Sequence, residues 1–355
     1  MLEKIKSMLT KLLITLSVWY TFYNKEFSSH SKKNIFKRIS LNSKGFFSKR
    51  LFPYDFKKWK YSDYISDMEV IKFSYINHPY SKLLRNKLVF SNYFRSYFNT
   101  PQVYYLIIKS SIKSVHPKIK AENFRGFINL LSENRKLIIK PNFGSRGAGI
   151  YLVELEEEKY LVNKKEVTEP ELQKFVNSLT SYIVVEFIEQ CGFSKGLFPL
   201  STNTLRINTF FDPILNKVIT KQPYVRIGTS RSVPTDNNSR GALFSMVDIE
   251  SGMLGVAIEP VSPGTIRQVT NHPETNVKIK GEIVPRWTEI KECILNTGRE
   301  ISPLIKVVGW DIVITDDDFV VIEGNNGPEQ GQQMLENPLA KDEDMSLFLK
   351  HSKIR

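Results

Sequence analysis

A short glycine-rich stretch between two strand-like runs places the strongest constraint on this chain. Residues 136–140 read K-L-I-I-K and residues 150–155 read I-Y-L-V-E-L, so one strand enters the stretch and another leaves it. P-loops and dinucleotide-binding turns lead into a helix instead. Glycines let backbone N–H groups turn inward around an anion, and a lysine adds positive charge. A phosphate-binding hairpin is predicted, with a plain glycine turn as the alternative; its residues are Lys140, Gly144, Ser145, Arg146, Gly147, Ala148 and Gly149.

Apolar and β-branched runs of strand length recur along the rest of the body. Strands are expected at residues 103–108, 136–140, 150–155, 182–188, 205–211, 218–225, 309–314 and 320–323, and helices at 84–94, 169–179 and 288–298. Asp316-Asp317-Asp318 marks a hairpin turn between the last two strands. This pattern predicts an α+β fold with antiparallel sheets rather than a doubly wound parallel sheet.

Three oxygen-bearing side chains near the C-terminal end predict a metal site. Asp311 follows Gly309-Trp310 at the start of one strand, and Glu323 and Asn325 end the returning strand. Because strand side chains alternate, Glu323 and Asn325 share a face, beside Asp311 on the neighbouring strand. Mg²⁺ prefers carboxylate and amide oxygens together with phosphate oxygens. The alternative is a buried acid paired with a nearby arginine.

Arginines mark two further regions of the sequence. Arg206 interrupts the apolar alternation that follows Asn203-Thr204-Leu205, and an inward arginine on a strand needs a carboxylate or a ligand phosphate. Arg226 and Arg240 fall in a region, residues 226–241, that resembles a loop. They bind a substrate carboxylate or phosphate, or they are simply solvated.

The formal net charge of +13 is concentrated at one end of the chain. Residues 1–60 hold 14 Lys and Arg against three acidic residues and so carry +11, which leaves the remainder nearly neutral. A nucleic-acid-binding face is therefore not expected. Cys191 and Cys293 form no CxxC or Cys/His pattern, which favours a reducing, cytoplasmic compartment over a disulfide framework or a zinc site.

The N-terminal segment has apolar residues at helical spacing. Its apolar stretch, residues 12–22, is too short to cross a membrane, and no signal-peptide cleavage site follows. Two interpretations remain open: a helix lying at the inner face of an anionic membrane through residues 1–25, or a first helix packed on the body. The apolar positions are Leu2, Ile5, Leu9, Leu12, Leu16 and Trp19.

Together these motifs resemble the ATP-grasp superfamily. More narrowly, the chain is similar to the ATP-grasp proteins associated with sugar transferases in cell-surface polysaccharide gene sets. The resemblance covers about residues 75–335 and includes residues 81–90 (S-K-L-L-R-N-K-L-V-F), 272–275 (H-P-E-T) and 281–289 (G-E-I-V-P-R-W-T-E).

The resemblance implies two α+β lobes with antiparallel sheets clamping ATP, preceded by a basic helical extension. The divisions expected are residues 1–74 for the extension, 75–185 for the small lobe and 186–345 for the C-terminal lobe. ATP and Mg²⁺ are the implied cofactors, with two metal ions and with Mn²⁺ as an alternative.

By matching position, the resemblance also assigns roles. Lys140 and the glycine loop would cover the phosphates, and Asp311, Glu323 and Asn325 would hold Mg²⁺. Lys140, Arg206 and Arg240 would be catalytic, with Arg206 neutralising charge on the transferred phosphate. The adenine and ribose contacts would come from Glu186, Phe187 and Glu189. Two departures are Ala242 after Arg240-Gly241, where relatives tend to carry a second glycine, and Cys191, where a histidine is common.

The implied activity is ligation of a small-molecule carboxylate to an amine, an alcohol or a glycan acceptor through an acyl phosphate. Phosphoryl transfer needs mainly positioning and charge neutralisation, which these residues can supply. The alternatives are an ATP-grasp kinase and a non-catalytic partner of a glycosyltransferase. Neither the acid nor the acceptor is specified by the sequence.

Overall fold

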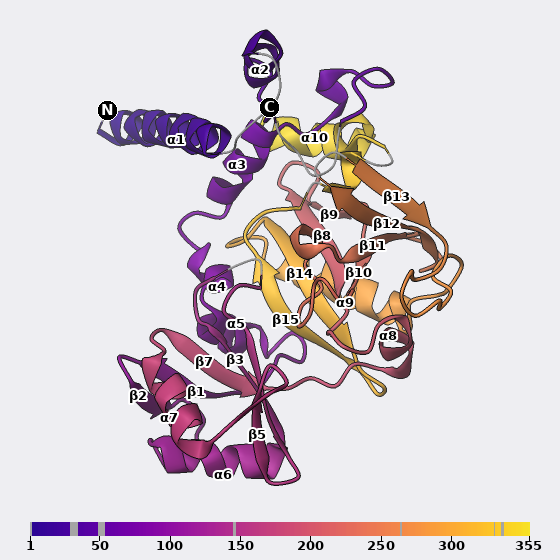
Figure 1. Ribbon diagram of the computed structural model, residues 1–355. Coiled ribbons are helices and arrows are strands. Elements are labelled where there is room, and N and C mark those ends of the chain that lie inside the picture. The colour runs from indigo at the N-terminus through magenta and orange to yellow at the C-terminus, as the bar shows by residue number, and fades with distance from the viewer. Residues whose placement is uncertain are drawn as a thin grey trace.

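A computed structural model describes residues 2–28, 35–48, 54–144, 147–262, 265–329, 331–334 and 337–355. Two antiparallel sheets form the body, one above the other in the view of Figure 1, and helices from both chain ends lie at the far end of the larger sheet. Ser145 and Arg146 of the glycine loop lie outside the described residues. The antiparallel sheets and their helices confirm the α+β prediction.

The smaller sheet has seven strands. Its order is β2 (Ser111–Ser114), β1 (Val103–Ile108), β7 (Tyr182–Glu186), β3 (Lys136–Pro141), β4 (Tyr151–Glu156), β5 (Lys159–Val162) and β6 (Lys165–Val167). Helices α6 (Phe124–Asn134) and α7 (Glu169–Ser178) bury their apolar stripes on one face of this sheet, in a single core with side chains of β1, β3, β4 and β7. Thr168 caps α7 by accepting from Glu171 N, while the Glu171 side chain accepts from Thr168 N, which satisfies two backbone donors at the helix start.

The larger sheet has eight strands and its own core. The order is β13 (Thr265–Val269), β12 (Leu254–Ser262), β11 (Leu243–Val247), β10 (Tyr224–Ile227), β8 (Leu205–Asp212), β14 (Val307–Ile314) and β15 (Phe319–Asn325), with β9 (Lys217–Thr220) paired to β8. Helices α4 (Lys82–Arg85), α5 (Lys87–Phe94), α8 (Gly192–Leu197) and α9 (Trp287–Glu300) pack against its main core. Phe94 and Phe98 meet the Trp310 ring edge-on, 5.3 and 5.5 Å away, so α5 belongs to the core of the larger sheet.

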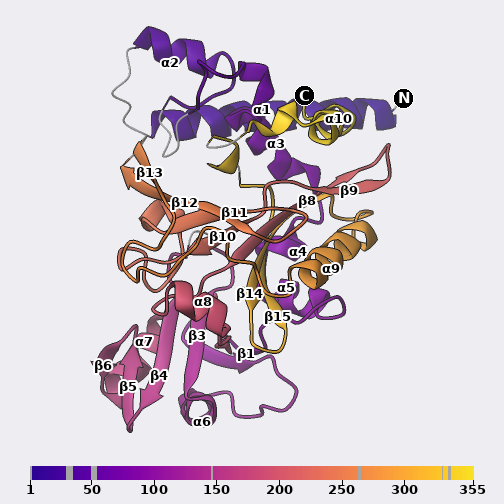
Figure 2. The same cartoon turned by 90° about the vertical axis from the view of Figure 1, so that its right-hand side faces the viewer.

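Helices from the N-terminal and C-terminal segments pack together beyond this sheet, as Figure 2 shows. Helix α3 (Asp67–Ile76) packs on α10 (Glu343–His351), where Phe73 stacks on Phe348 at 6.0 Å. Helix α1 (Leu2–Phe27) lies on α3, and α2 (Ile35–Asn42) follows it. Four short 3-10 turns complete the described elements: Tyr61–Asp63, Asn238–Arg240, Gly331–Met334 and Leu339–Lys341. Within the described ranges, no helix combines the length and apolar character needed to cross a membrane.

Two sequence predictions about the larger sheet are wrong. The single strand expected at residues 218–225 is two strands, because β9 ends at Thr220 and β10 begins at Tyr224. Gln222 has a φ of +49° between them, and Pro223 lacks the N–H that a continuous strand would need. Residues 226–241 are not all loop, since Arg226 and Ile227 belong to β10.

In the smaller sheet, the strand expected at residues 182–188 ends earlier than predicted, because β7 stops at Glu186.

Candidate nucleotide and metal site

A cleft of about 1170 Å³ takes its walls from both sheets. Strands β3 and β7 contribute from the smaller sheet, and β8, β10, β14 and β15 contribute from the larger one. Most of the predicted site residues line this cleft: Lys140, Gly144, Gly147, Glu186, Phe187, Glu189, Arg206, Asp311, Glu323 and Asn325. Arg240 is exposed at the end of a 3-10 turn and, with Ala148 and Gly149, is not among the lining residues. The catalytic role of Arg240 stays a prediction.

The glycine loop is held at its base and touches the opposite lobe. Asn142 N donates to Ser181 O at 2.8 Å, and Asn142 O accepts from Lys87 N at 3.0 Å. Gly147 has a φ of +66°, and a Cβ added there would lie 2.9 Å from Thr235 Cγ2. A side chain at this position would therefore press against the loop that follows β10. The close approach depends on glycine for both its dihedral angle and its lack of a Cβ.

Two buried lysines, Lys87 and Lys140, lie next to the glycine loop. Lys140 ends β3 with its Nζ 3.5 Å from Ile322 O. Burial, reinforced by the nearby Lys87 charge, lowers the pKa of Lys140 to about 8 against the opposing pull of Glu323 and Asp311. Lys87 Nζ donates to Gly144 O at 3.1 Å and lies 3.3 Å from Glu323 Oε1. Lys87 thus ties the loop to a predicted metal ligand.

Sequence analysis missed Lys87 as an individual site residue. The only signal was a lysine at the start of an otherwise apolar helix, inside the 81–90 segment of the family resemblance. A lysine at such a position is ordinarily solvent-exposed. Its burial follows from the return of β15 beside α5, a contact between residues more than 200 positions apart.

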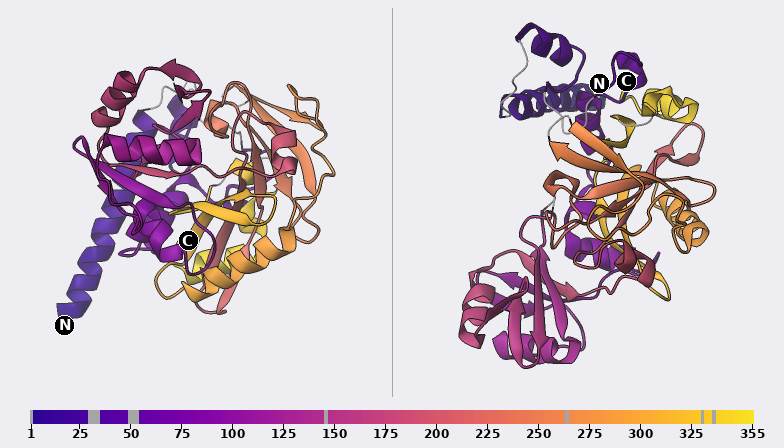
Figure 3. Two further views of the ribbon diagram at one scale, coloured as in Figure 1. Left: turned by 90° about the horizontal axis from the view of Figure 1, so that it is seen from below. Right: turned by 45° about the vertical axis from the view of Figure 1, so that its right-hand side comes forward.

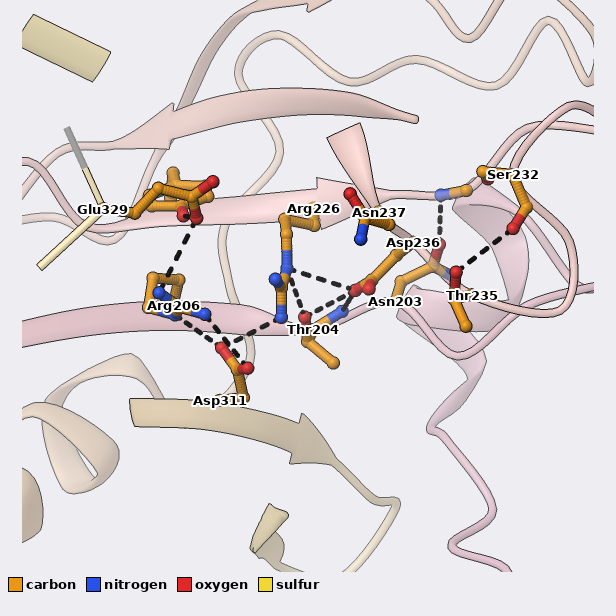
Figure 4. Close-up of polar contacts among 12 residues, drawn as sticks. Asn203, Thr204, Arg206, Arg226, Ser232, Thr235, Asp236, Asn237, Asp311 and Glu329 are labelled. Atoms are coloured by element: carbon orange, nitrogen blue, oxygen red, sulfur yellow. Dashed lines mark hydrogen bonds and ion pairs between the residues drawn. The ribbon is translucent and has the colours of Figure 1, made fainter. Parts of the chain in front are cut away.

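Asp311 is surrounded by donors, as the close-up in Figure 4 shows. It lies opposite Arg206 in the β14–β8 ladder and opposite Glu323 in the β14–β15 ladder. Its Oδ1 accepts from Arg206 Nε at 2.5 Å and from Arg226 Nη2 at 2.9 Å. Its Oδ2 accepts from Arg206 Nη2 at 3.0 Å and from Asn325 Nδ2 at 3.1 Å. Burial favours a raised pKa, but the two arginines outweigh it and hold the pKa of Asp311 at about 2.

A second carboxylate, Asp236, lies beside Arg226 and was also missed. Its Oδ2 accepts from Thr204 Oγ1 at 2.5 Å and from Thr204 N at 2.9 Å, and it is 3.5 Å from Arg226 Nε. Burial raises the pKa of Asp236, although Arg226 and the Thr204 hydrogen bonds oppose that rise. Asp236 comes from the same loop as Thr235, which contacts Gly147, so one loop reaches both the arginines and the glycine loop.

Glu329 completes the charged network from the segment after β15. Its carboxylate lies 3.6 Å from Arg206 Nη1 and accepts a hydrogen bond from the Tyr224 hydroxyl. Burial, together with the Glu329 charge, raises the pKa of Tyr224 well above its ordinary value. The two arginines therefore face three carboxylates, from β14, from the loop after β10 and from the segment after β15.

The oxygen donors suit Mg²⁺ in kind. Glu323 and Asn325 line the cleft, and carboxylate and amide oxygens are its usual protein ligands. Asp311 is more constrained, because its four contacts use all of the roughly four lone-pair directions of a carboxylate. Within the part of the chain that the structure describes, no group of three or more His, Cys, Asp or Glu side chains forms a ready metal cluster.

The end of β7 forms the wall nearest the predicted adenine pocket. Glu186 pairs with Gln102, since Glu186 N donates to Gln102 O at 2.9 Å and Gln102 N donates to Glu186 Oε2 at 3.1 Å. Phe187 lies under the Lys136 ammonium at 5.3 Å, and Glu189 pairs with Lys195 at 2.8 Å. The chain leaves the smaller sheet after Glu186, and Cys191 N next donates to Ile314 O of β14 at 2.8 Å. Cys191 is buried and does not line the cleft.

Known structures give low-identity matches. D-alanyl-alanine synthetase A from Vibrio cholerae is 11% identical, with 77% of this chain and 66% of that chain covered and a TM-score of 0.45. The D-alanine–D-alanine ligase from Bacillus anthracis is 14% identical over 77% of this chain and 69% of that one, with a TM-score of 0.40. The ATP-grasp ligase PsnB, complexed with a minimal precursor, Mg and ADP, is 11% identical over 78% and 62%, with a TM-score of 0.38.

The chain spans 66%, 62% and 46% of the first three structures that it matches. No curated protein matches it. One family does, over residues 70–344, which is more than three quarters of the chain. With its two antiparallel sheets and the cleft between them, this chain belongs to the sugar-transfer associated ATP-grasp family.

Proposed function

We propose that this protein is an ATP-dependent ligase that joins a carboxylate to an amine or an alcohol through an acyl phosphate. One observation carries the proposal. A single cleft brings the lysine and glycine loop of one sheet opposite the oxygen donors and paired arginines of the other. Cations on one wall and metal ligands on the other are what a nucleoside triphosphate needs for binding and phosphoryl transfer.

The nucleotide lies along the cleft in this proposal. Lys140 and the backbone of the glycine loop contact the phosphates, and Glu186, Phe187 and Glu189 contact ribose and adenine. A lysine with a pKa of about 8 is still mainly protonated at neutral pH. Arrival of the negatively charged phosphates raises that pKa further and fixes the charge.

Mg²⁺ would be held by Glu323, Asn325 and Asp311, with two ions as the expected number and Mn²⁺ as an alternative. The metal would neutralise charge on the phosphate oxygens. Arg206 and Arg226, which both donate to Asp311, hold that carboxylate in place.

The reaction consists of two balanced steps. A substrate carboxylate oxygen attacks the γ-phosphorus of ATP, and the bond to ADP breaks. The amine or alcohol then attacks the carbonyl carbon, loses a proton and displaces inorganic phosphate. Arg206 neutralises charge on the transferred phosphoryl group, and closure of the glycine loop on the Thr235 loop keeps water away from the acyl phosphate. A cell-surface polysaccharide or its precursor is the proposed acceptor; the family description supports an association with sugar transfer and names no acceptor.

The test combines calorimetry with product analysis. Titration with Mg-ATP should show micromolar binding by the wild type and at least tenfold weaker binding by Glu323→Gln. The control variant Glu250→Gln should bind Mg-ATP as the wild type does, because the Glu250 carboxylate is exposed and does not line the cleft. ADP release is then screened against carboxylic acids, with hydroxylamine added to trap an acyl phosphate as a hydroxamate. ADP with a phosphorylated acceptor and no hydroxamate would indicate a kinase. No nucleotide binding at all would contradict the proposal and favour a non-catalytic partner.

A further inference from the structure

Helix α1 has two apolar faces, and only one of them is covered. Val18 and Phe22 are buried against Ile71 of α3, with Ile14 packed beside them. Eight large apolar side chains of the same helix are exposed, by 44 to 74%. At 100° per residue, these eight positions fall within an arc of roughly 140° on the side facing away from α3. They are Met8, Leu9, Leu12, Leu13, Leu16, Trp19, Tyr20 and Phe27.

Helix α2 extends the exposed apolar surface at the same end of the molecule. Arg38 of α2 pairs with Glu26 of α1 at 2.6 Å, which joins the two helices. Ile35, Phe36 and Ile39 of α2 are each more than half exposed. Of 23 exposed large apolar side chains among the described residues, 11 lie between positions 8 and 39. Exposed apolar residues scattered singly need no explanation, but such a concentration marks an interaction surface.

The charge of the surrounding segment identifies the partner. Residues 1–60 carry +11, and Trp19 and Tyr20 lie within the exposed arc. Tryptophan and tyrosine favour the headgroup level of a bilayer, and lysines near the surface add attraction to anionic lipids. We propose that the exposed face of α1, extended by α2, docks this protein on an anionic lipid surface with α1 lying in the plane of the headgroups.

A second copy of the chain fits this face less well. Two copies meeting through α1 would bring two +11 segments together, and like charges repel across such an interface. The exposed arc is also broad over residues 8–20, whereas helix pairing uses a narrow seam of apolar positions. A bilayer accepts a broad apolar arc without requiring a complementary shape.

The position of α1 agrees with docking of the whole molecule. Seen from below in Figure 3, α1 projects away from the two sheets, with its N-terminal end farthest out. It lies at the end of the molecule opposite the smaller sheet in Figures 1 and 2. Thr21 and Lys25, on the side of α1 away from the exposed arc, contribute to the rim of the cleft. Docking through α1 would therefore bring the rim of the cleft close to the lipid while leaving the cleft open.

The test uses the full chain and vesicles of two compositions, phosphatidylcholine alone and phosphatidylcholine with 30% phosphatidylglycerol. Co-sedimentation should show binding to the anionic vesicles at least about tenfold stronger than to the neutral ones, and weaker at high salt. The double variant Leu13→Glu/Leu16→Glu changes exposed side chains only and should lose at least about tenfold of this binding. Ile214→Glu/Leu215→Glu, on an exposed turn between β8 and β9, is the matched control and should bind as the wild type does.

Circular dichroism and Mg-ATP binding, each measured without lipid, confirm that the variants are folded. A shift of Trp19 fluorescence to shorter wavelength on vesicle addition, absent in Trp19→Phe, reports insertion of the exposed arc. Wild-type protein that ignores both vesicles, or a double variant that binds like the wild type, overturns the proposal. It is equally overturned if the wild type sediments as a dimer without lipid and the double variant as a monomer, because a second copy then covers the face.

Discussion

Replacement of Asp311 by asparagine tests how the charged core of the cleft is held together. The substitution keeps the shape of the side chain but removes the negative charge that Arg206 and Arg226 share in a buried site. Removing one partner of a buried ion pair typically costs about 3–5 kcal/mol, because the remaining charge has lost its counterion. We expect a loss near the lower end of this range, since Asp236 and Glu329 still face the arginines.

The pH dependence of stability gives a second estimate for the same residue. The pKa of Asp311 falls from 3.8 to about 2, which at 1.36 kcal/mol per pKa unit amounts to roughly 2 kcal/mol of stabilisation. Because the folded-state pKa is the lower one, this contribution is present above pH 3.8 and is lost as the pH falls towards 2. The difference in stability between wild type and Asp311→Asn should therefore shrink over that interval.

Urea unfolding at pH 7 and between pH 4 and pH 2 measures both effects. Tryptophan fluorescence is a suitable signal because Trp310, next to Asp311, is fully buried. Asp317→Asn, at an exposed hairpin turn, is the control and should stay within about 0.5 kcal/mol of the wild type. A loss below about 1 kcal/mol for Asp311→Asn at pH 7, or a difference that does not change with pH, would refute this account of the charged core.

Three further predictions concern the phosphate side of the cleft. Lys140 has a pKa of about 8 in the absence of nucleotide. The affinity for Mg-ATP should therefore decline above pH 8, because the Lys140 ammonium loses a proton there. In a pH series of calorimetric titrations, Lys140→Arg should remove that decline. Lys87→Met removes the link to Gly144 O and should raise the KM for ATP roughly tenfold with a smaller effect on kcat; equal changes in both would contradict a positioning role. Gly147→Ala adds a Cβ 2.9 Å from Thr235 Cγ2 and should slow turnover at saturating ATP. If the contact between this Cβ and Thr235 Cγ2 is responsible, the double variant Gly147→Ala/Thr235→Ser should recover part of the rate.

Local patterns along the sequence predicted much of the fold, and most of the site residues predicted from them line the cleft. Strand β1 has the predicted bounds, α9 differs by one residue at its start and two at its end, and β14 starts two residues early and ends at the predicted Ile314. These elements combine a strong apolar period with clear ends, which local physics can specify. The glycine loop and the Glu323 and Asn325 pair were equally local, because each is defined by spacing within a few residues.

Contacts between distant segments account for what the sequence did not reveal. Strands β11, β12 and β13 were missed because they are stabilised by antiparallel pairing with one another and, through β11, with β10. Asp236 gave no signal, since its partner Thr204 is 32 positions away. Arg226 was assigned to a loop because the expected strand ended at Val225 and residues 226–241 resemble a polar loop, whereas β10 continues to Ile227. In each case the deciding interaction joins segments that are distant in the sequence, either by strand pairing or by a side-chain contact, and no short window of sequence contains it.

The separate hydrophobic cores of the two sheets have a consequence for how this protein tolerates change. Side chains of the smaller sheet pack with α6 and α7, while those of the larger sheet pack with α5 and α9, and the two clusters share no residue. A substitution inside one of these two clusters therefore acts first on one wall of the cleft. Helix α5 links the walls, because its Phe90 and Phe94 belong to the core of the larger sheet while its Leu88 packs against Val103, Ile183 and Val185 on the other face of the smaller sheet. Catalytic geometry is then vulnerable mainly along the seam, where Lys87, Gly147 and Thr235 connect the two halves.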